Sequence, residues 1–507
     1  MDKIKQKLLT DKDLNILRKK FSSKKIGLVH GVFDFFHYGH LLHIEKAKSL
    51  CDILVVSITS DKFIKKGIGR PFYNNFQRKE ILSSLMQVNY LYVSESESSV
   101  ELINKLKPDI YFKGNDYANF KKDYSKKIIK EVNAVKKNKG KVIFTNEKTF
   151  SSTKLINNYS ENLDDETKKY LLNISREISF ESIHKMLKEI KKMKILIIGE
   201  AIIDKYTFTL SLGKSPKEQI IPVTAQSTET YGGGIIATAN HIIDFVDDCT
   251  ILTILSKDTK ENKTIKNLVN KKVKQKYFKS INSINIEKNR FIDKNENYKQ
   301  FQTNSLDKIE LSEKVEKNII NYLKKNQNKF DHIIVHDFGH GMLKSNIIKY
   351  LQTQSSKLSV NVQTNSSNVG YNYLTKYSKL NYFSIDEPEA RLALKDKESD
   401  CLELFKKLKK IIKFKSGSIT FGRHGTNVFD GKEMHFAPAL SKDPVDTLGA
   451  GDAYFAISSL FTKISSNSKV LALAGNTAGA LKIKFLGHRR SLGKLEFMNY
   501  LKALLNI

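Results

Sequence analysis

The chain has 507 residues, more than one ordinary domain accommodates, so about two or three domains are expected. Hydrophobic residues make up 40% and charged residues 28% of the sequence, which is typical of folded globular proteins and excludes a disordered chain. The longest apolar runs are far shorter than the ~20 residues of a membrane span, and the first residues lack the apolar core of a signal peptide. We therefore expect a cytoplasmic protein with no membrane partner. Cys51, Cys249 and Cys401 lie too far apart in sequence to indicate a disulfide framework or a clustered zinc site.

The formal net charge of +32 comes almost entirely from lysine, because the sequence contains only nine arginines. Proteins that read bases or clamp nucleic-acid phosphates favour the arginine fork, whereas here lysines are spread along the whole chain. The charge therefore indicates a diffuse solvated surface and no nucleic-acid partner. Such a surface would still help to gather anionic substrates.

Residues 1–24 are predicted to form a charged helical extension, and residues 25–158 the first domain. In that domain short apolar runs alternate with helical patterns. The predicted strands are residues 26–30, 53–58, 90–93, 109–112 and 142–144, and the predicted helices are residues 38–50, 75–86, 100–107 and 124–137. This alternation favours an α/β fold with a Rossmann-like, doubly wound parallel sheet.

The sequence GVFDFFHYGH at residues 31–40 follows the first of these strands and opens a helix. His37 and His40, with Gly39 between them, stand at the helix N-terminus, where the N–H groups and the helix dipole favour an anion. Imidazole donors there would stabilise charge growing on an α-phosphate under attack, and glycine lets the phosphate approach the backbone. The segment predicts a nucleotide-phosphate site. His43, one turn further on, is expected on the helix surface.

Two more segments suit the binding of a triphosphate. KKGIGR at residues 65–70 is a basic, glycine-bearing loop that would neutralise phosphate charge. FSSTK at residues 150–154 opens the last helix with the hydroxyls of Ser151, Ser152 and Thr153. Taken alone, the first segment also fits a flexible charged loop and the second a plain helix cap.

Residues 25–158 resemble the cytidylyltransferase-like nucleotidyltransferases with an HxGH motif, above all the nucleotidyltransferase domain of the bifunctional enzymes of ADP-heptose synthesis. The resemblance rests on residues 31–40, 60–61, 69–71, 77–78, 113–117 and 150–153, with Asn115 in place of the family's second glycine. It implies that His37 and His40 act in catalysis, assisted by Lys66, Lys65 or both. It also implies that Asp34 and Asp116 face a sugar phosphate. The nucleotide contacts that it implies are Gly31, Phe33, Gly39, Lys65, Ser151, Ser152 and Thr153.

Residues 159–192 are charged and helix-prone and are predicted to form a helical linker. KILIIG at residues 194–199 begins a second α/β domain, residues 193–507. Its strongest segment is DTLGAGDA at residues 446–453. Gly449, Ala450 and Gly451 form a tight loop at a helix N-terminus, whose N–H groups would bind a transferring phosphoryl group. Asp452 would accept the proton of the attacking hydroxyl.

Three weaker signals accompany this loop. Glu200 and Asp204 follow the first strand of the domain and would bind sugar hydroxyls. Gly233, in YGGG at residues 231–234, would allow a close approach to the backbone. Glu389, in DEPE at residues 386–389, would position magnesium-bound water.

Across residues 193–507 these features resemble the ribokinase-like (pfkB) sugar kinases, an α/β fold with a small β lid, and again the kinase domain of the bifunctional heptose enzymes. Residues 211–223, 290–291, 337–339 and 420–425 match further landmarks. The resemblance implies Asp452 as catalytic base and Gly449, Ala450 and Gly451 as anion hole. It implies Asp204 as sugar ligand, Glu389 near Mg²⁺ and Asn476 near the nucleotide base.

Three departures from this family are visible. Ile235 and Ile236 stand where the family often has asparagine, Asp386 replaces the asparagine of an Asn-x-x-Glu motif, and the kinase domain comes second in the chain. These departures leave the predicted reaction type unchanged, but they leave open whether heptose is the sugar on which the kinase acts.

The resemblance as a whole implies a bifunctional sugar phosphate kinase, with heptose the first candidate, and sugar 1-phosphate nucleotidyltransferase. Its product would be a nucleotide-activated sugar for a surface polysaccharide, with Mg²⁺ and ATP as cofactors and CTP as the other candidate for the transferase half. An alternative keeps the transferase and makes the kinase half a degenerate sugar-binding or regulatory module. A homo-oligomer is left open. A third reading, a nucleic-acid-binding protein, lacks any recognition motif.

His332, His336 and His340 are spaced by four residues, which on a helix would suggest a metal-binding face. The apolar residues between the first two indicate a buried strand, and a glycine loop precedes the third. We therefore do not predict a metal site here.

Overall fold

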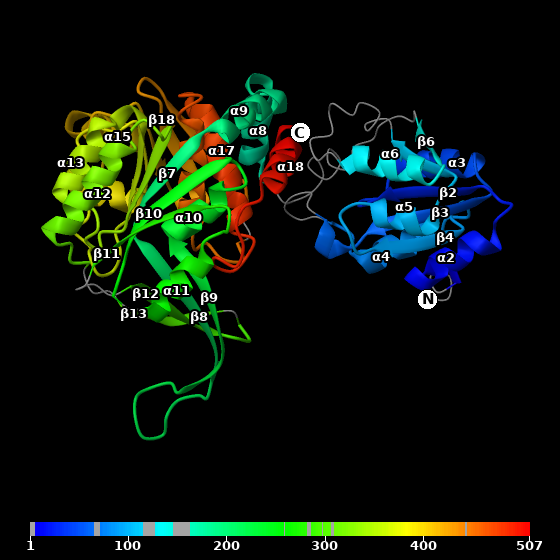
Figure 1. Ribbon diagram of the computed structural model, residues 1–507, viewed down its shortest axis with the longest axis horizontal. Coiled ribbons are helices and arrows are strands. Elements are labelled where there is room, and N and C mark those ends of the chain that lie inside the picture. The colour runs from blue at the N-terminus through cyan, green and yellow to red at the C-terminus, as the bar shows by residue number, and fades with distance from the viewer. Residues whose placement is uncertain are drawn as a thin grey trace. The chain divides into compact units, whose positions relative to one another are not determined.

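The computed structural model describes residues 6–64, 71–114, 127–145, 163–257, 259–280, 285–296, 298–305, 309–441 and 444–506. The chain divides into two compact units, Met1–Asn162 with Asn499–Ile507, and Leu163–Met498 (Figure 1). Each unit is described by itself below.

The first unit is built on a parallel sheet. Its strands are β1 (Leu8–Leu9), β2 (Ile26–Gly31), β3 (Ile53–Thr59), β4 (Tyr90–Ser94), β5 (Ile110–Gly114) and β6 (Lys141–Thr145). They lie in the order β1-β4-β3-β2-β5-β6, and every neighbouring pair is parallel. β2 and β3 are continuous apolar runs because each is buried on both faces. The predicted parallel sheet is confirmed.

Helices cover both faces of this sheet. They are α2 (Asp11–Lys20), α3 (Tyr38–Ser49), α4 (Asn75–Ser83), α5 (Val100–Leu106) and α6 (Lys127–Lys137), with a 3₁₀ turn η1 (Asp61–Phe63). α3 and α4 bury Ile44 and Leu82 against one face, whereas α2 and α5 bury Leu14 and Ile103 against the other. The arrangement is doubly wound, so the loop from β2 to α3 opens at the carboxyl ends of the strands, where ligands bind in such folds.

The N-terminal extension differs from the prediction. Leu8 and Leu9 form the edge strand β1, which pairs in parallel with Leu91 and Tyr92 and interrupts the expected helix before Asp11–Lys20. A pair of leucines carries no periodicity that distinguishes a short strand from the start of a helix.

The second unit contains a nine-stranded sheet in the order β11-β10-β7-β14-β15-β16-β17-β18-β19. Neighbours from β11 to β17 are parallel, whereas β18 and β19 join antiparallel. The strands are β7 (Lys194–Gly199), β10 (Asp248–Leu255), β11 (Lys274–Lys279), β14 (His332–Asp337), β15 (Leu358–Val362), β16 (Tyr382–Asp386), β17 (Ser416–Thr420), β18 (Thr426–Phe429) and β19 (Met434–Ala437).

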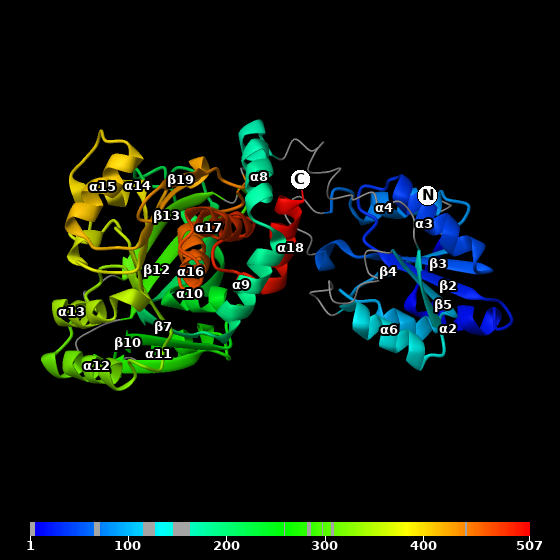
Figure 2. The same cartoon turned by 90° about the horizontal axis from the view of Figure 1, so that it is seen from above.

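Two sets of helices cover this sheet (Figure 2). α12 (Glu313–Lys325), α13 (Ser345–Thr353), α14 (Glu387–Leu394) and α15 (Cys401–Ile411) share one hydrophobic core with the sheet. α9 (Phe180–Lys192), α10 (Ile235–Ile242), α16 (Ala450–Phe461) and α17 (Ser468–Lys482) pack together on the other face. The remaining elements of this unit are α8 (Asp165–Glu177), α11 (Thr259–Leu268) and the 3₁₀ turns η4 (Ser355–Lys357), η5 (Leu374–Lys376) and η6 (Gly422–His424). The last helix, α18 (Lys494–Leu505), contains the boundary between Met498 and Asn499 at which the two units divide.

A separate four-stranded sheet corresponds to the predicted lid. Its strands are β8 (Ala201–Ser211), β9 (Val223–Gly234), β12 (Ile286–Asp293) and β13 (Lys299–Ser305), in the order β13-β12-β8-β9. The hairpin of β8 and β9 projects from the body of the second unit (Figure 1). β9 runs directly into α10 at Gly234, whose φ of 59° is left-handed, so the lid and the helix meet at a residue type that tolerates this turn.

The helices within the predicted linker belong to the second unit. α9 buries Ile183, Leu187 and Ile190, and α8 is tied to α17 by an ion pair between Glu177 and Lys469. None of the helices in the described part of the chain is long and apolar enough to cross a lipid bilayer.

We expect a cut after Asn162 to leave two soluble, folded fragments, because it separates the two units except for Asn499–Ile507, which stays on the second fragment. A fragment of residues 193–507 should melt at a lower temperature than one of residues 163–507. It lacks α8 and α9, whose buried apolar side chains each stabilise by roughly 1.5–3 kcal/mol. Circular dichroism melting of both fragments tests this, and equal melting temperatures would contradict it.

Candidate active sites

The two histidines of the HxGH segment lie face to face at the N-terminus of α3. The carbonyl of His37 accepts the N–H groups of His40 at 2.9 Å and Leu41 at 3.2 Å, which starts the helix. The imidazole rings of His37 and His40 stack with centroids 3.9 Å apart and 19° between their planes. Burial lowers the pKa of His37, which favours the neutral ring at pH 7. The pair stands where the first amides of a helix attract an anion.

The loop before this helix is bent by unusual backbone conformations. Phe33 and Phe35 have φ angles of 52° and 48°, a left-handed region that costs bulky residues about 1–3 kcal/mol each. The ring of Phe33 packs 5.3 Å from His40, and a Cβ on Gly31 would lie 3.2 Å from that ring. Gly31 and Phe33 therefore form the support behind His40.

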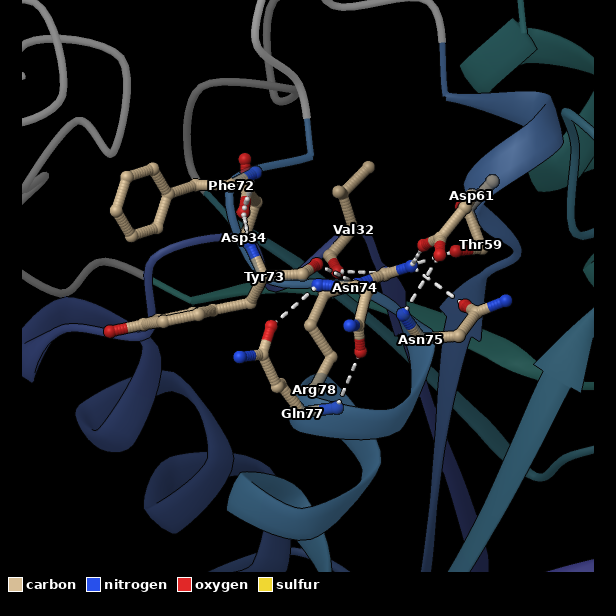
Figure 3. Close-up of polar contacts among 10 residues, drawn as sticks. All are labelled: Val32, Asp34, Thr59, Asp61, Phe72, Tyr73, Asn74, Asn75, Gln77 and Arg78. Atoms are coloured by element: carbon tan, nitrogen blue, oxygen red, sulfur yellow. Dashed lines mark hydrogen bonds and ion pairs between the residues drawn. The ribbon is translucent and has the colours of Figure 1, made fainter. Parts of the chain in front are cut away.

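Arg78 holds the surroundings of this loop together (Figure 3). Its guanidinium is fully buried and donates to the carbonyls of Val32 at 2.7 Å and Thr59 at 2.9 Å, and to Asp61 at 2.5 Å. It also donates to the carbonyl of Tyr73 at 3.0 Å and to the side chain of Asn75 at 2.8 Å. One side chain thus joins the ends of β2 and β3 to the start of α4. The sequence marks Arg78 as a landmark but does not show this role.

Replacing Arg78 by methionine should destabilise the first unit by about 3–5 kcal/mol, because it leaves buried carbonyls and Asp61 without their donor. Amide hydrogen exchange measured by mass spectrometry on peptides from residues 53–83 should lose about two orders of magnitude of protection. Arg18→Met is the matched control. Arg18 pairs with Asp109 at the surface, so its loss should cost at most about 1 kcal/mol, and equal effects of the two variants would contradict the prediction.

Two other predicted or matched residues of the first unit bind protein groups. Asp34 is buried, and its Oδ1 accepts the N–H groups of Phe72 at 2.8 Å and Tyr73 at 3.1 Å (Figure 3). Lys113, at the end of β5, pairs with Glu131 of α6 at 3.2 Å. The predicted contact of Asp34 with a sugar phosphate stays a prediction.

His43 does not lie on the helix surface as expected. It is half-buried, and its Nδ1 lies 2.7 Å from the Thr145 hydroxyl. Burial, followed by the charge of Lys113, lowers the pKa of His43 to about 4. The sequence spacing could not show that β6 covers this face of α3. Gly39 lies in the first turn of α3, and Lys65, Lys66, Asp116, Ser151, Ser152 and Thr153 lie outside the described residues.

In the second unit Asp452 lies in the first turn of α16 and is 9% exposed. Its Oδ1 accepts the amide of Gln363 at 2.5 Å and lies 3.4 Å from Nε2 of His336. His336 is fully buried, and its Nδ1 lies 2.7 Å from the Thr238 hydroxyl. Burial alone would raise the pKa of Asp452, but interactions with His336, His488 and Gln363 outweigh it and lower the pKa below its ordinary value. Asp452 is therefore ionised at neutral pH.

The glycine loop has the geometry that the sequence predicts. Gly449 caps α16 with a φ of 75°, a conformation that favours glycine, and a Cβ there would lie 2.7 Å from His488. The N–H of Ala450 donates to the carbonyl of Thr447 at 3.2 Å, whereas the space beside Gly451 is open. The loop thus leads directly into the first turn of α16, which contains Asp452.

Asp204 lies beside this loop at the base of the lid. It is buried and accepts Arg290 at 2.6 Å through Oδ1, while Oδ2 lies 3.4 Å from Nε2 of His488. A Cβ on Gly233 would lie 2.5 Å from Oδ2 of Asp204, so no side chain fits at position 233 without moving the carboxylate. The structure thus brings Asp204 and Gly233 together, and the ion pair of Asp204 with Arg290 is a feature that the sequence did not reveal.

Three other predicted residues have structural partners. Glu200 is fully buried and accepts the N–H groups of Phe338 and Met342, and burial, followed by the charge of Asp337, raises its pKa to about 7. The Asn476 amide is bonded to Thr426 and to the carbonyls of Ala437 and Pro438. Glu389 forms a capping box with Asp386 and accepts the N–H of Thr364. The ligand contacts of these three residues stay predictions.

The histidines spaced by four residues lie at separate places. His332 contacts the Ser359 hydroxyl at 3.0 Å, His336 faces Asp452, and His340 accepts the N–H of Ile309 with its carbonyl. Across the described ranges no cluster of three or more histidine, cysteine or acidic side chains could hold a metal ion. One of these histidines nevertheless belongs to the candidate site, since His336 lies near the end of β14 and 3.4 Å from Asp452.

Comparison with known proteins assigns each unit to a class of transferase. The family profile "Cytidylyltransferase-like" matches residues 28–158, and the profile "pfkB family carbohydrate kinase" matches residues 192–492. The second match spans more than half of the 507 residues. The chain therefore belongs to the pfkB family of carbohydrate kinases.

Curated relatives match the first unit. The proteins named "Bifunctional protein HldE" of Campylobacter jejuni subsp. doylei and Helicobacter acinonychis are 41% and 43% identical over 117 and 112 residues. These segments are 23% and 22% of this chain, and the chain spans about a quarter, 24% in both cases, of the length of these relatives.

Two solved structures align with part of this chain. The phosphofructokinase-2 of Escherichia coli with substrates and products has a TM-score of 0.49 at 12% identity, over 62% of this chain and 99% of that one. A ribokinase of Arabidopsis thaliana with ribose and ATP has a TM-score of 0.46 at 13% identity, over 62% and 99%.

Proposed function

We propose that the chain is a bifunctional enzyme whose second unit phosphorylates a sugar phosphate from ATP. Its first unit couples a sugar 1-phosphate, supplied to it as such, to a nucleotide and releases pyrophosphate. The observation that carries the proposal is that the predicted reacting side chains of each unit lie at a helix N-terminus: Asp452 behind Gly449 in one, and the stacked His37 and His40 in the other. The matches to both families support it.

In the kinase unit Asp452 is the proposed general base. It is ionised at neutral pH and held by Gln363, so it accepts the proton of the sugar hydroxyl as that oxygen attacks the γ-phosphorus. The N–H groups that follow Gly449 stabilise the charge on the transferred phosphoryl group. Asp204 orients the sugar through hydrogen bonds to its hydroxyls.

In the transferase unit the imidazoles of His37 and His40 donate hydrogen bonds to the α-phosphate of the nucleoside triphosphate. A phosphate oxygen of the sugar 1-phosphate attacks the α-phosphorus, and pyrophosphate leaves. Lys65, Lys66, Ser151, Ser152 and Thr153 are proposed to bind the departing phosphates, and Asp116 the sugar.

The residues around α14 fit a magnesium ion held mainly by water and phosphates. Asp386 is exposed, and carboxylate oxygens are the ligands that Mg²⁺ prefers. Burial, followed by the charge of Asp386, raises the pKa of Glu389 to about 8, and a cation nearby would favour its ionised form. When bound, Mg²⁺ would neutralise phosphate charge.

A second candidate keeps the transferase and makes the second unit a sugar-binding or regulatory module. The ion pair between Asp204 and Arg290 favours it, because this carboxylate is already engaged, as does Ile236, which is buried where related kinases often have asparagine. The ionised Asp452 beside an intact glycine loop favours the kinase.

Product analysis separates these candidates. The full chain is incubated with Mg²⁺, with ATP or CTP, and with a panel of heptose and hexose phosphates, and products are identified by mass spectrometry. Sugar bisphosphate together with nucleotide sugar supports the bifunctional enzyme. Nucleotide sugar alone, formed only from added sugar 1-phosphate, supports the second candidate. If neither product forms, both candidates are refuted.

A further inference from the structure

Lys482, the last residue of α17, is fully buried and binds two backbone carbonyls with its ammonium group. Its Nζ donates to the carbonyl of Leu448 at 2.7 Å and to that of Gly487 at 2.7 Å, and it lies 4.7 Å from the centre of the Phe485 ring. Among the described residues no carboxylate forms a salt bridge with it, although buried lysines usually have such a partner. Burying a charged group without an ion-pair partner is energetically unfavourable, so this ammonium group indicates a role beyond packing.

The two carbonyls belong to the two segments that border the kinase site. Leu448 directly precedes Gly449, the cap of α16. Gly487 directly precedes His488, which lies 3.4 Å from Asp204. One ammonium group therefore joins the glycine loop to the segment beside the proposed sugar ligand.

Asp446 holds the same two residues from their other side. Its Oδ1 accepts the N–H of Leu448 at 3.0 Å, and its Oδ2 accepts the N–H of Gly487 at 2.9 Å. Leu448 and Gly487 are thus each bound through the N–H by a carboxylate and through the carbonyl by an ammonium. This double clamp fixes the direction of the backbone that enters Gly449.

We propose that Lys482 is a positioning residue of the kinase reaction, a tethered cation that orders the glycine loop for phosphoryl transfer. Carbonyl oxygens also coordinate monovalent cations from solution, so a side-chain ammonium at this point makes such an ion unnecessary. Its charge also adds to the field that stabilises the transferred phosphoryl group. The inference rests on the proposed kinase function.

The charge is present at neutral pH. Burial lowers the pKa of Lys482 to about 8, and Asp446 and Asp452 oppose this lowering. Asp446 itself pairs with Lys299 of the lid strand β13 at 2.6 Å.

The test compares Lys482→Met, which keeps the alkyl stem and removes the charge, with Lys469→Met at the start of the same helix, where the lysine pairs with Glu177. Sugar-dependent ADP formation is measured in the full chain. We expect Lys482→Met to lower kcat by about 10²–10³ with the KM for ATP changed less than threefold, as for loss of one oxyanion donor. Ammonium chloride, but not choline chloride, should raise the kcat of Lys482→Met at least tenfold. Lys469→Met should have the kcat and the KM for ATP of the wild type.

The outcomes separate the two proposals. A wild type without sugar-dependent ADP formation refutes the kinase itself, and this inference with it. A wild type that is active while Lys482→Met stays within threefold overturns only the inference, as does a loss that ammonium does not restore. If Lys482→Met fails to fold, the wild type is assayed with tetramethylammonium in place of all alkali cations. Unchanged turnover supports the tethered cation, and a tenfold loss overturns it.

Discussion

Asp452→Asn should abolish sugar phosphorylation while leaving the affinity for ATP nearly unchanged. Asparagine keeps the size of the side chain and can still accept the amide of Gln363, so the loop at Gly449 should persist. It cannot take a proton from the sugar hydroxyl. General-base catalysis contributes about 10²–10⁴ in rate, so the loss should reach at least that range. Coupled measurement of ADP formation and calorimetric titration of ATP check the two halves of this expectation.

Nucleotidyl transfer from an added sugar 1-phosphate, measured in the same sample, is the control and should not change. The pH dependence provides a second readout. Because the pKa of Asp452 is held below its ordinary value, the base stays ionised as the pH falls from 7 to 5. Its protonation should therefore cause no loss of rate in that window. A mutant that phosphorylates sugar at the wild-type rate would make Asp452 a structural residue.

His37→Ala and His40→Ala should each lower pyrophosphate release by about 10²–10³, because each removes one donor from the developing charge on the α-phosphate. Sugar phosphorylation should continue at the wild-type rate, since the two reaction centres belong to different units of the chain. Enzymatic detection of pyrophosphate and of ADP in parallel checks both expectations. Transferase activity close to the wild type in a folded mutant would remove the HxGH segment from the site.

The central strands of the two parallel sheets could be predicted because they are buried on both faces. β2 and β7 are plain apolar runs, and a run of this kind followed by glycine has few alternatives in an α/β chain. β1 escaped prediction because two residues carry no pattern. The predicted helix at residues 75–86 ends earlier, at Ser83, since propensity places the end of a helix poorly.

The candidate sites were predictable where one short segment holds the chemistry. Residues 31–40 and 446–453 each contain a turn, a helix start and the reacting side chain. His336, Gln363 and Lys482 could not be found in this way, because each reaches the glycine loop from another element of the sheet or from the end of a helix. In a sequence so rich in lysine, only the fold distinguishes one buried ammonium from the solvated ones.

The face-to-face stacking of His37 and His40 couples ligand binding to protons. Two imidazolium rings at a centroid separation of 3.9 Å repel each other, and burial already lowers the pKa of His37. A polyanion that docks against the pair would raise this pKa again, so its binding should take up protons from the buffer. The apparent affinity would then fall as the pH rises through the lowered pKa of His37 toward its raised value in the complex, and the heat of binding would vary with the ionisation enthalpy of the buffer. Calorimetric titration of a triphosphate in two buffers would count the protons taken up.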